Sequence, residues 1–138
     1  MPTRPKVRRI RALAASLTLA IATVFAASGL VAAANPNQTF DVTVCKTPNG
    51  KNAFVTATWS GMQVDAYVFF VTSTDGSGGT FQPVPAPGES GSLTETLRGD
   101  LNNIQSVEIS LFRATGGSKF REVASATITD PASSWPTC

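Results

Sequence analysis

The side chains in this sequence that could do chemistry are two cysteines, nine carboxylates and an Arg-Gly-Asp tripeptide. The chain contains no histidine, which is the usual general base of enzymes and a frequent metal ligand. Four carboxylates, Asp41, Asp65, Glu95 and Glu108, fall within apolar runs that alternate like strands, and solvated sheet faces account for them. A glycosidase pair would need a deep cleft, for which a domain this small has little room. We therefore expect a non-enzymatic protein with no cofactor and no metal site.

The two cysteines, Cys45 and Cys138, are expected to form a structural disulfide. A redox or metal role would need a close second thiol or a histidine, and the sequence offers neither. In the chain-entropy description, closing a loop of about 90 residues stabilises the fold by roughly 4 to 5 kcal/mol. The bridge would join the first strand of the domain to the last residue.

The tripeptide Arg98-Gly99-Asp100 is followed by Leu101. One interpretation is an integrin-like recognition loop, in which a flexible turn presents a guanidinium and a carboxylate to a receptor. The other is a plain turn between strands, because glycine and aspartate favour turns and Leu101 is a residue that the domain would bury. A buried Leu101 would hold the tripeptide close to the body of the domain.

The first 34 residues have the pattern of a secretory signal peptide. Basic residues occupy positions 4, 6, 8, 9 and 11, and an Ala/Leu/Val/Ile-rich run over 12–31 ends on three alanines. We expect export by the general secretory pathway with cleavage after Ala34, or after Ala33. An uncleaved membrane anchor is the alternative, since the apolar run is long enough to cross a bilayer. The domain that follows would span residues 35–138.

Removal of the signal peptide would reverse the sign of the net charge. The whole chain carries +2, but residues 35–138 contain six basic and nine acidic side chains, hence a net charge of −3. The six basic residues are scattered among acids and form no stripe that could displace counterions from phosphates. Nucleic acid is therefore not an expected partner. The length suffices for one domain with one core.

The elements that position these residues are predicted to be strands, because apolar residues recur at every second position. The most apolar stretch runs from Phe54 to Val71 and is divided at Ser60-Gly61, which predicts two neighbouring central strands. Prolines at 83, 85 and 87 restrict the segment around them to a sheet edge or an extended loop. The full set of predicted strands is Phe40–Val44, Ala53–Trp59, Val64–Thr72, Phe81–Pro87, Leu93–Leu97, Val107–Leu111 and Ala124–Ile128.

Seven short strands separated by turn residues predict an all-β, two-sheet Greek-key sandwich. The sequence also resembles fibronectin type III domains in Ala57-Thr58-Trp59, in Tyr67 with Phe69, in Leu101 before the strand Val107–Leu111, and in the Gly116-Gly117 turn. It departs from that family where Val107 stands near the usual tyrosine position, and in the pairing of Cys45 with Cys138. The wider immunoglobulin-like class is therefore equally open. The resemblance implies a binding or spacer module and fixes no ligand.

One sheet has more apolar side chains than a single core can use. If Tyr67, Phe69, Ile109 and Leu111 point inward, then Val68, Phe70 and Phe112 point outward, with Phe81 nearby. Left open, this face would bind a protein or a carbohydrate at the cell surface. Covered by the proline-containing segment or by the C-terminal tail with Trp135, it would be additional core. The first case favours a binding or adhesion module and the second a structural spacer, while a small hydrolase or inhibitor is the remotest alternative.

The leader and the disulfide make one prediction together. The exported protein should begin near Asn35, and reduction should add the mass of one hydrogen atom at each of the two cysteine sulfurs. Intact mass measured with and without reductant checks both statements. An exported chain that retains the apolar run, or one with free thiols, would contradict them.

Overall fold

The computed structural model describes residues 30–31 and 36–138, so most of the expected signal peptide lies outside the described residues. The described chain forms six β-strands and two short 3-10 helices. The strands are β1 (Leu30–Val31), β2 (Thr39–Lys46), β3 (Asn52–Ser73), β4 (Gly76–Arg98), β5 (Ile104–Gly116) and β6 (Lys119–Ile128), and the helices are η1 (Leu101–Asn103) and η2 (Ala132–Ser134). The expected all-β class is confirmed.

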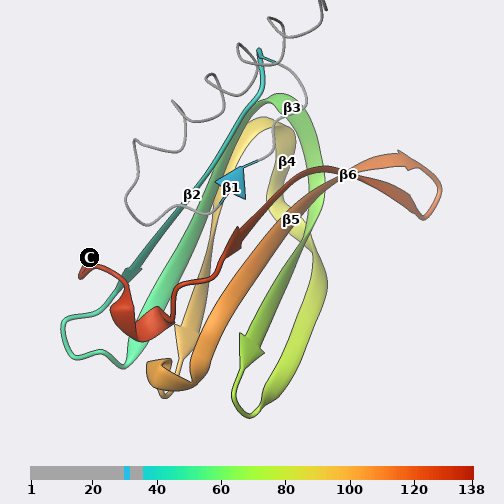
Figure 1. Ribbon diagram of the computed structural model, residues 1–138. Helices are drawn as coiled ribbons and strands as arrows, with labels where there is room; N and C mark the ends of the chain where they lie inside the picture. Colours follow the sequence, from blue (N-terminus) through green and yellow to red (C-terminus); the bar gives the residue numbers. More distant parts are fainter. Residues whose placement is uncertain (1–29, 32–35) are drawn as a thin grey trace, which may run out of the picture.

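The strands form one antiparallel sheet that curls around the core (Figure 1). Its order is β1-β6-β5-β3-β2, and β4 pairs with β3 outside this path. The first part of β3, Asn52–Ser60, lies between β2 and the second half of β4. The second part, Ala66–Ser73, lies between the first half of β4 and β5. Strand β3 therefore belongs to both sides of the curled sheet.

The two strands expected on either side of Ser60-Gly61 are one continuous strand, which corrects that prediction. Gly61 has a φ of +72° and lies at a shift in register between β3 and β4, so the chain changes direction without turning back. A Cβ atom at this position would collide with the backbone oxygen of Asn37. Glycine here therefore bends the strand and lets the segment before β2 approach it closely.

The segment after β3 is also more regular than expected. The glycines between Asp75 and Gly79 are typical of a flexible connection, but β4 begins at Gly76, and Ser73 already pairs with Gly76 across a tight turn. Among the described residues, β4 pairs with no strand except β3. The proline-containing segment therefore lies on a sheet edge, as predicted.

The core lies between the two sides of the curled sheet. Tyr67, Phe69, Ile109 and Leu111 are buried and point inward, which confirms the predicted strand faces. The core also contains Leu101, as expected, and residues from the C-terminal tail. Its largest members are Phe40, Trp59, Met62, Tyr67, Phe69, Leu93, Leu97, Leu101, Ile104, Ile109, Leu111, Ile128 and Trp135.

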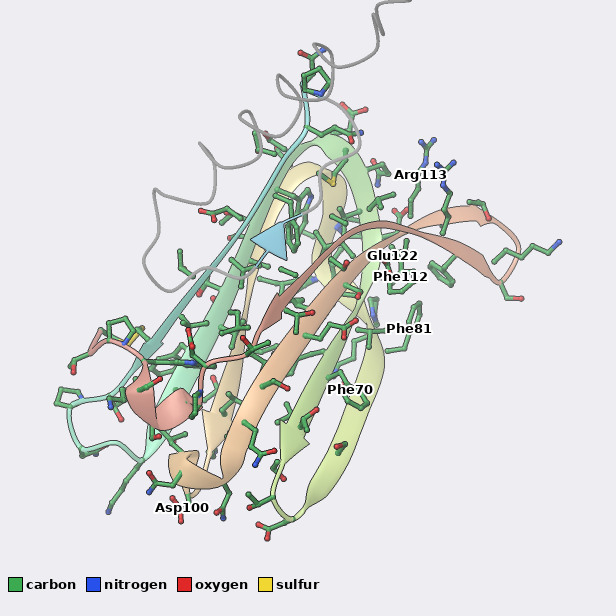
Figure 2. The ribbon with its side chains drawn as sticks, viewed as in Figure 1. Phe70, Phe81, Asp100, Phe112, Arg113 and Glu122 are labelled. Carbon is green, nitrogen blue, oxygen red and sulfur yellow. A yellow bond between two sulfur atoms is a disulfide. The ribbon has the colours of Figure 1, made fainter. Side chains whose placement is uncertain are left out.

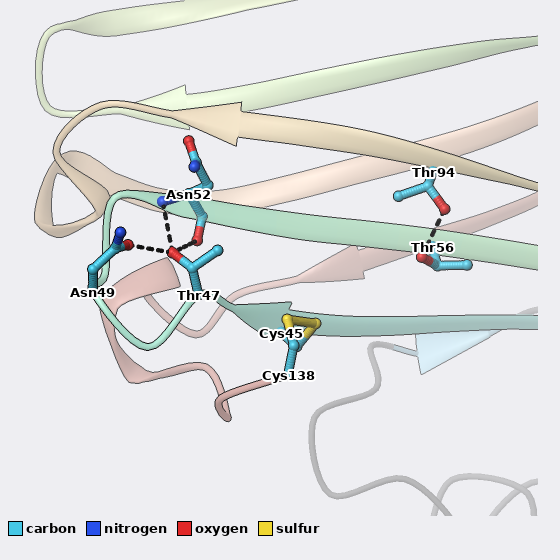
Figure 3. Close-up of a disulfide and its surroundings, with 7 residues drawn as sticks. All are labelled: Cys45, Thr47, Asn49, Asn52, Thr56, Thr94 and Cys138. Carbon is cyan, nitrogen blue, oxygen red and sulfur yellow. Dashed lines mark hydrogen bonds between the residues drawn. A yellow bond between two sulfur atoms is a disulfide. The ribbon is translucent and has the colours of Figure 1, made fainter.

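The C-terminal tail is fastened to the edge of β2. Cys45 and Cys138 form the predicted disulfide, with their Cα atoms 5.0 Å apart (Figure 3). The backbone N–H of Lys46 donates to the oxygen of Pro136 at 2.8 Å, and the N–H of Cys138 donates to the oxygen of Lys46 at 3.0 Å. The tail thus adds a short parallel bridge, Lys46 to Thr137, beside the end of this edge strand.

Trp59 should be the most costly core residue to truncate. Its side chain is 3% exposed, and its indole N–H donates to the oxygen of Gly88 at 3.3 Å. We expect Trp59→Ala to lower the free energy of unfolding by about 3 to 5 kcal/mol, because the substitution leaves a large cavity. Denaturant unfolding measures this loss. Trp59→Phe should retain most of the stability, and a loss below about 1 kcal/mol for the alanine variant would show that the site tolerates truncation.

Candidate functional site

The outward face formed by β3, β4 and β5 carries a cluster of aromatic rings (Figure 2). We define the aromatic patch as Val68, Phe70, Phe81, Phe112 and Phe120. Phe70, Phe81 and Phe120 are 38%, 50% and 41% exposed, whereas Val68 and Phe112 are partly buried. The rings of Phe81 and Phe112 lie 5.7 Å apart between centroids, and those of Phe81 and Phe120 lie 4.9 Å apart, both edge to face. Phe81, Phe112 and Phe120 therefore form a contiguous cluster, and Val68 and Phe70 lie beside it on the same face, opposite Phe81 and Gly79.

Neither the C-terminal tail nor the proline-containing segment covers the patch. Trp135 lies in the core, and helix η2, which ends just before it, packs against η1 and β5, far from the turn that joins β5 to β6 (Figure 1). The proline-containing segment adds the ring of Phe81 to the patch and does not lie over it. Beneath the rings, Ala66 and Ser110 occupy outward positions and are 2% and 4% exposed. Side chains on this face therefore cover the sheet at these two positions, while Phe70, Phe81 and Phe120 stay more than a third exposed.

Phe120 belongs to the patch and was missed in the sequence. It stands in β6 opposite Ala114, on the same side of the hairpin as Phe112. No signal in the sequence marked this position, because regular pairing outward from Gly116 and Lys119 would place residue 120 opposite Thr115, and a shift in register between Ala114 and Gly116 places it opposite Ala114 instead. Val123, by contrast, packs against the core and is not part of the patch.

The base of the β5–β6 hairpin is held by Asp65. One oxygen of its carboxylate accepts the backbone N–H of Ala114 at 2.8 Å, and the other accepts the side-chain amide of Gln63 at 2.8 Å. These hydrogen bonds, with the nearby Arg113 guanidinium, hold the pKa of Asp65 below its usual value. Asp65 therefore stays ionised and fixes the hairpin, and with it Phe112 and Phe120, relative to β3.

The two faces of the β5–β6 hairpin carry charges of opposite sign. Arg113 and Arg121 pair across the two strands and alternate with Phe112 and Phe120, so they point to the side opposite the patch. Figure 2 shows Arg113 pointing away from Phe112. Glu122 stands opposite Phe112, and Glu108 stands opposite Phe70. The charged side chains that share the face of the aromatic rings are therefore the carboxylates Glu108 and Glu122, and a polar border of this kind is usual at the rim of a protein interface.

Glu95, in the second half of β4, points inward. Its carboxylate accepts a hydrogen bond from the hydroxyl group of Tyr67. Gln82 also accepts from this hydroxyl, at 3.3 Å. Burial and the nearby Glu95 carboxylate raise the pKa of Tyr67 from 10.0 to about 12. The contact links the second half of β3 to the second half of β4, so it joins the two sides of the curled sheet.

The Arg-Gly-Asp segment forms the end of β4 and the cap of η1. Oδ1 of Asp100 accepts the backbone N–H of Asn102 at 3.0 Å and its side-chain amide at 2.9 Å. The N–H of Gly99 donates to the oxygen of Lys51 at 3.3 Å, and Leu101 is buried as expected. The loop lies at the opposite end of the molecule from Phe112 (Figure 2). Asp100 thus has a structural task as a helix cap, while Arg98 remains exposed.

Known proteins give no guide to this arrangement, because no family model, curated protein or solved structure matches the chain. Within residues 30–31 and 36–138, no group of three or more carboxylate, cysteine or histidine side chains could hold a metal ion. The same residues contain no helix that is long and apolar enough to cross a membrane. The aromatic patch is thus the strongest candidate site of the described chain.

The tyrosine contact can be tested directly, because Tyr67 is the only tyrosine in the sequence. In the folded protein, phenolate absorbance should appear with a midpoint near pH 12 instead of pH 10.0. Since the folded state holds this proton more tightly, the corresponding stabilisation is complete below pH 10.0 and is lost as the pH rises toward 12. Glu95→Gln should lower the midpoint, because it removes the negative charge beside the hydroxyl. A midpoint near 10.0 in the folded wild-type protein would contradict the contact.

Proposed function

We propose that the chain is an exported, non-enzymatic binding module that uses the aromatic patch to contact its partner. The observation that carries this proposal is the presence of Phe70, Phe81 and Phe120, each more than a third exposed, on one face of a fold that has a separate buried core. Exposed phenylalanines cost solubility, so a cluster of them on one face marks an interaction surface. Export is supported by the basic and apolar leader and by the disulfide, which persists in oxidising compartments.

A protein partner fits the patch better than a carbohydrate. A sugar ring stacks on a flat, exposed aromatic face, and a polysaccharide needs several such faces in one plane. Phe81 stands at 63° to Phe112 and at 69° to Phe120, so the three rings form no common plane. Rings packed edge to face leave gaps between them, which suit apolar side chains of a protein.

The proposed role draws on an immunoglobulin-like interpretation of the curled sheet. If β3 and β4 are each counted as two segments, β2, the first part of β3 and the second part of β4 make one side. The first part of β4, the second part of β3, β5 and β6 make the other. This grouping has seven segments and supports a Greek-key sandwich related to fibronectin type III domains, in which the patch lies on the four-segment face.

The binding role predicts that Phe120→Ser weakens partner capture without weakening the fold. Phe120 is 41% exposed, so its replacement should leave the melting temperature almost unchanged. Capture of proteins from the secreted and cell-surface fractions by the immobilised chain should fall tenfold or more, as expected for an aromatic residue worth about 1.4 kcal/mol or above.

Arg98→Ala is the matched control, since Arg98 is exposed and belongs to the tripeptide loop at the other end of the molecule. It should leave capture intact. Loss of capture in Arg98→Ala alone would assign recognition to the loop. Equal capture by the wild type and by Phe120→Ser would favour a structural spacer.

A further inference from the structure

The first half of β4 presents a strand edge that nothing described occupies. From Gly76 to Phe81 the strand pairs with β3 on one side only, and no described strand lies on the other. In an antiparallel strand, alternate residues direct both their N–H and their C=O groups to the same side. Such an edge is a template for a further strand. The segment Gly-Ser-Gly-Gly-Thr-Phe carries no charge and no proline that would prevent this pairing.

The remaining edges of the described sheet each carry a feature that discourages pairing. The C-terminal tail bridges the end of β2 at Lys46, and β1 pairs with β6 at Ala126 and Thr127. The second half of β4 has the inward-pointing carboxylate of Glu95, and its middle has three prolines. Natural proteins use covering segments, inward charges and prolines to protect sheet edges. The stretch Gly76–Phe81 lacks all three and carries no charged side chain, unlike β2 with Asp41 and β6 with Lys119 and Arg121.

The sequence of this edge is complementary to itself. If two copies align their β4 edges antiparallel with Gly79 on the two-fold axis, Gly79 faces its counterpart and Gly78 faces Thr80 of the second copy. Ser77 then faces Phe81 of the second copy. Each pair joins residues of equal parity, so the outward faces of both sheets stay on the same side. The two aromatic patches would lie on one continuous surface.

Phe70 gives a reason for the axis to pass through Gly79. The two residues are paired across β3 and β4, and the Phe70 ring leans over the glycine: a Cβ atom at residue 79 would lie only 2.7 Å from its Cδ2 atom. Across the axis, the two Phe70 residues would be three strand spacings apart, roughly 14 Å along the sheet. Both rings lean toward the axis over glycines, so they would approach each other and bury surface that is now 38% exposed.

We propose that two copies of this chain associate through antiparallel pairing of Gly76–Phe81, which makes one continuous sheet with the Phe70 rings at its two-fold axis. The inference extends the proposed binding role by naming a second copy as occupant of one end of the patch. It leaves Phe112 and Phe120 on the open surface of the dimer. Failure of the dimer and failure of partner binding at Phe120 are therefore separate outcomes.

Gly78→Lys tests the pairing with little effect on the isolated chain. A Cβ atom at Gly78 meets nothing within 4 Å, and a lysine on a strand edge opposes pairing. Sedimentation equilibrium over a range of protein concentrations should show a dimer for the wild type. The dissociation constant should rise tenfold or more in Gly78→Lys. Thr58→Lys adds the same charge at an exposed position on the other side of the sheet and should dimerise like the wild type.

Two further measurements separate this edge from other contacts. Phe70→Ser should also weaken dimerisation tenfold or more, while Phe120→Ser should leave it unchanged. Hydrogen exchange of amides in Gly76–Phe81 should slow as the protein concentration rises, whereas exchange in Ser90–Leu97 should not. A wild-type protein that is monomeric up to about 1 mM overturns the proposal. So does a dimer that Gly78→Lys leaves intact or that gives no protection at this edge.

Discussion

The structure depends on the continuity of β3, which is hydrogen-bonded to β2, β4 and β5 along its 22 residues. A straight strand of that length would bury one face along its whole extent. The bulge at Gly61 instead turns its second half, so Trp59 and Phe69 face one common core from different sides. Three strands, β2, β4 and β5, pair with β3 directly, and β6 joins the sheet through β5. The outward face of the second half, where the rings gather, is therefore set by the same bend.

Alternation of side chains was enough to predict the inward residues. Tyr67, Phe69, Ile109 and Leu111 are buried because each has period-two neighbours that fix its face. The link between strands was harder to predict, since Ser60-Gly61 has the composition of a turn. Whether glycine reverses or bends a chain depends on contacts from distant residues, here the backbone of Asn37. The same limit applies to Gly76–Gly79, whose glycines resemble a loop but pair in a strand.

The candidate site was predictable in part for the same reason. Strand parity placed Phe70 and Phe112 outward, but it could not show whether the tail would cover them. That outcome depends on Trp135, which is buried in the core, and on the disulfide that holds the tail beside β2. The position of Phe120 depends on how β5 and β6 pair in their hairpin, which places it opposite Ala114. The patch thus depends on how neighbouring strands pair. Alternation in the sequence predicts the two faces of a single strand but not which strands lie side by side.

The disulfide between Cys45 and Cys138 also changes how the domain would bear mechanical load. Tension applied between the start of β2 and Cys138 would run along β2 and through the sulfur atoms, since a covalent bond yields far later than a sheet does. The two cysteines are separated by 93 residues in sequence, and the strands between them would stay outside the path of the force. Oxidised, the domain would act as a short inextensible link. With the disulfide reduced, the same tension could unfold the strands, and the domain would lengthen.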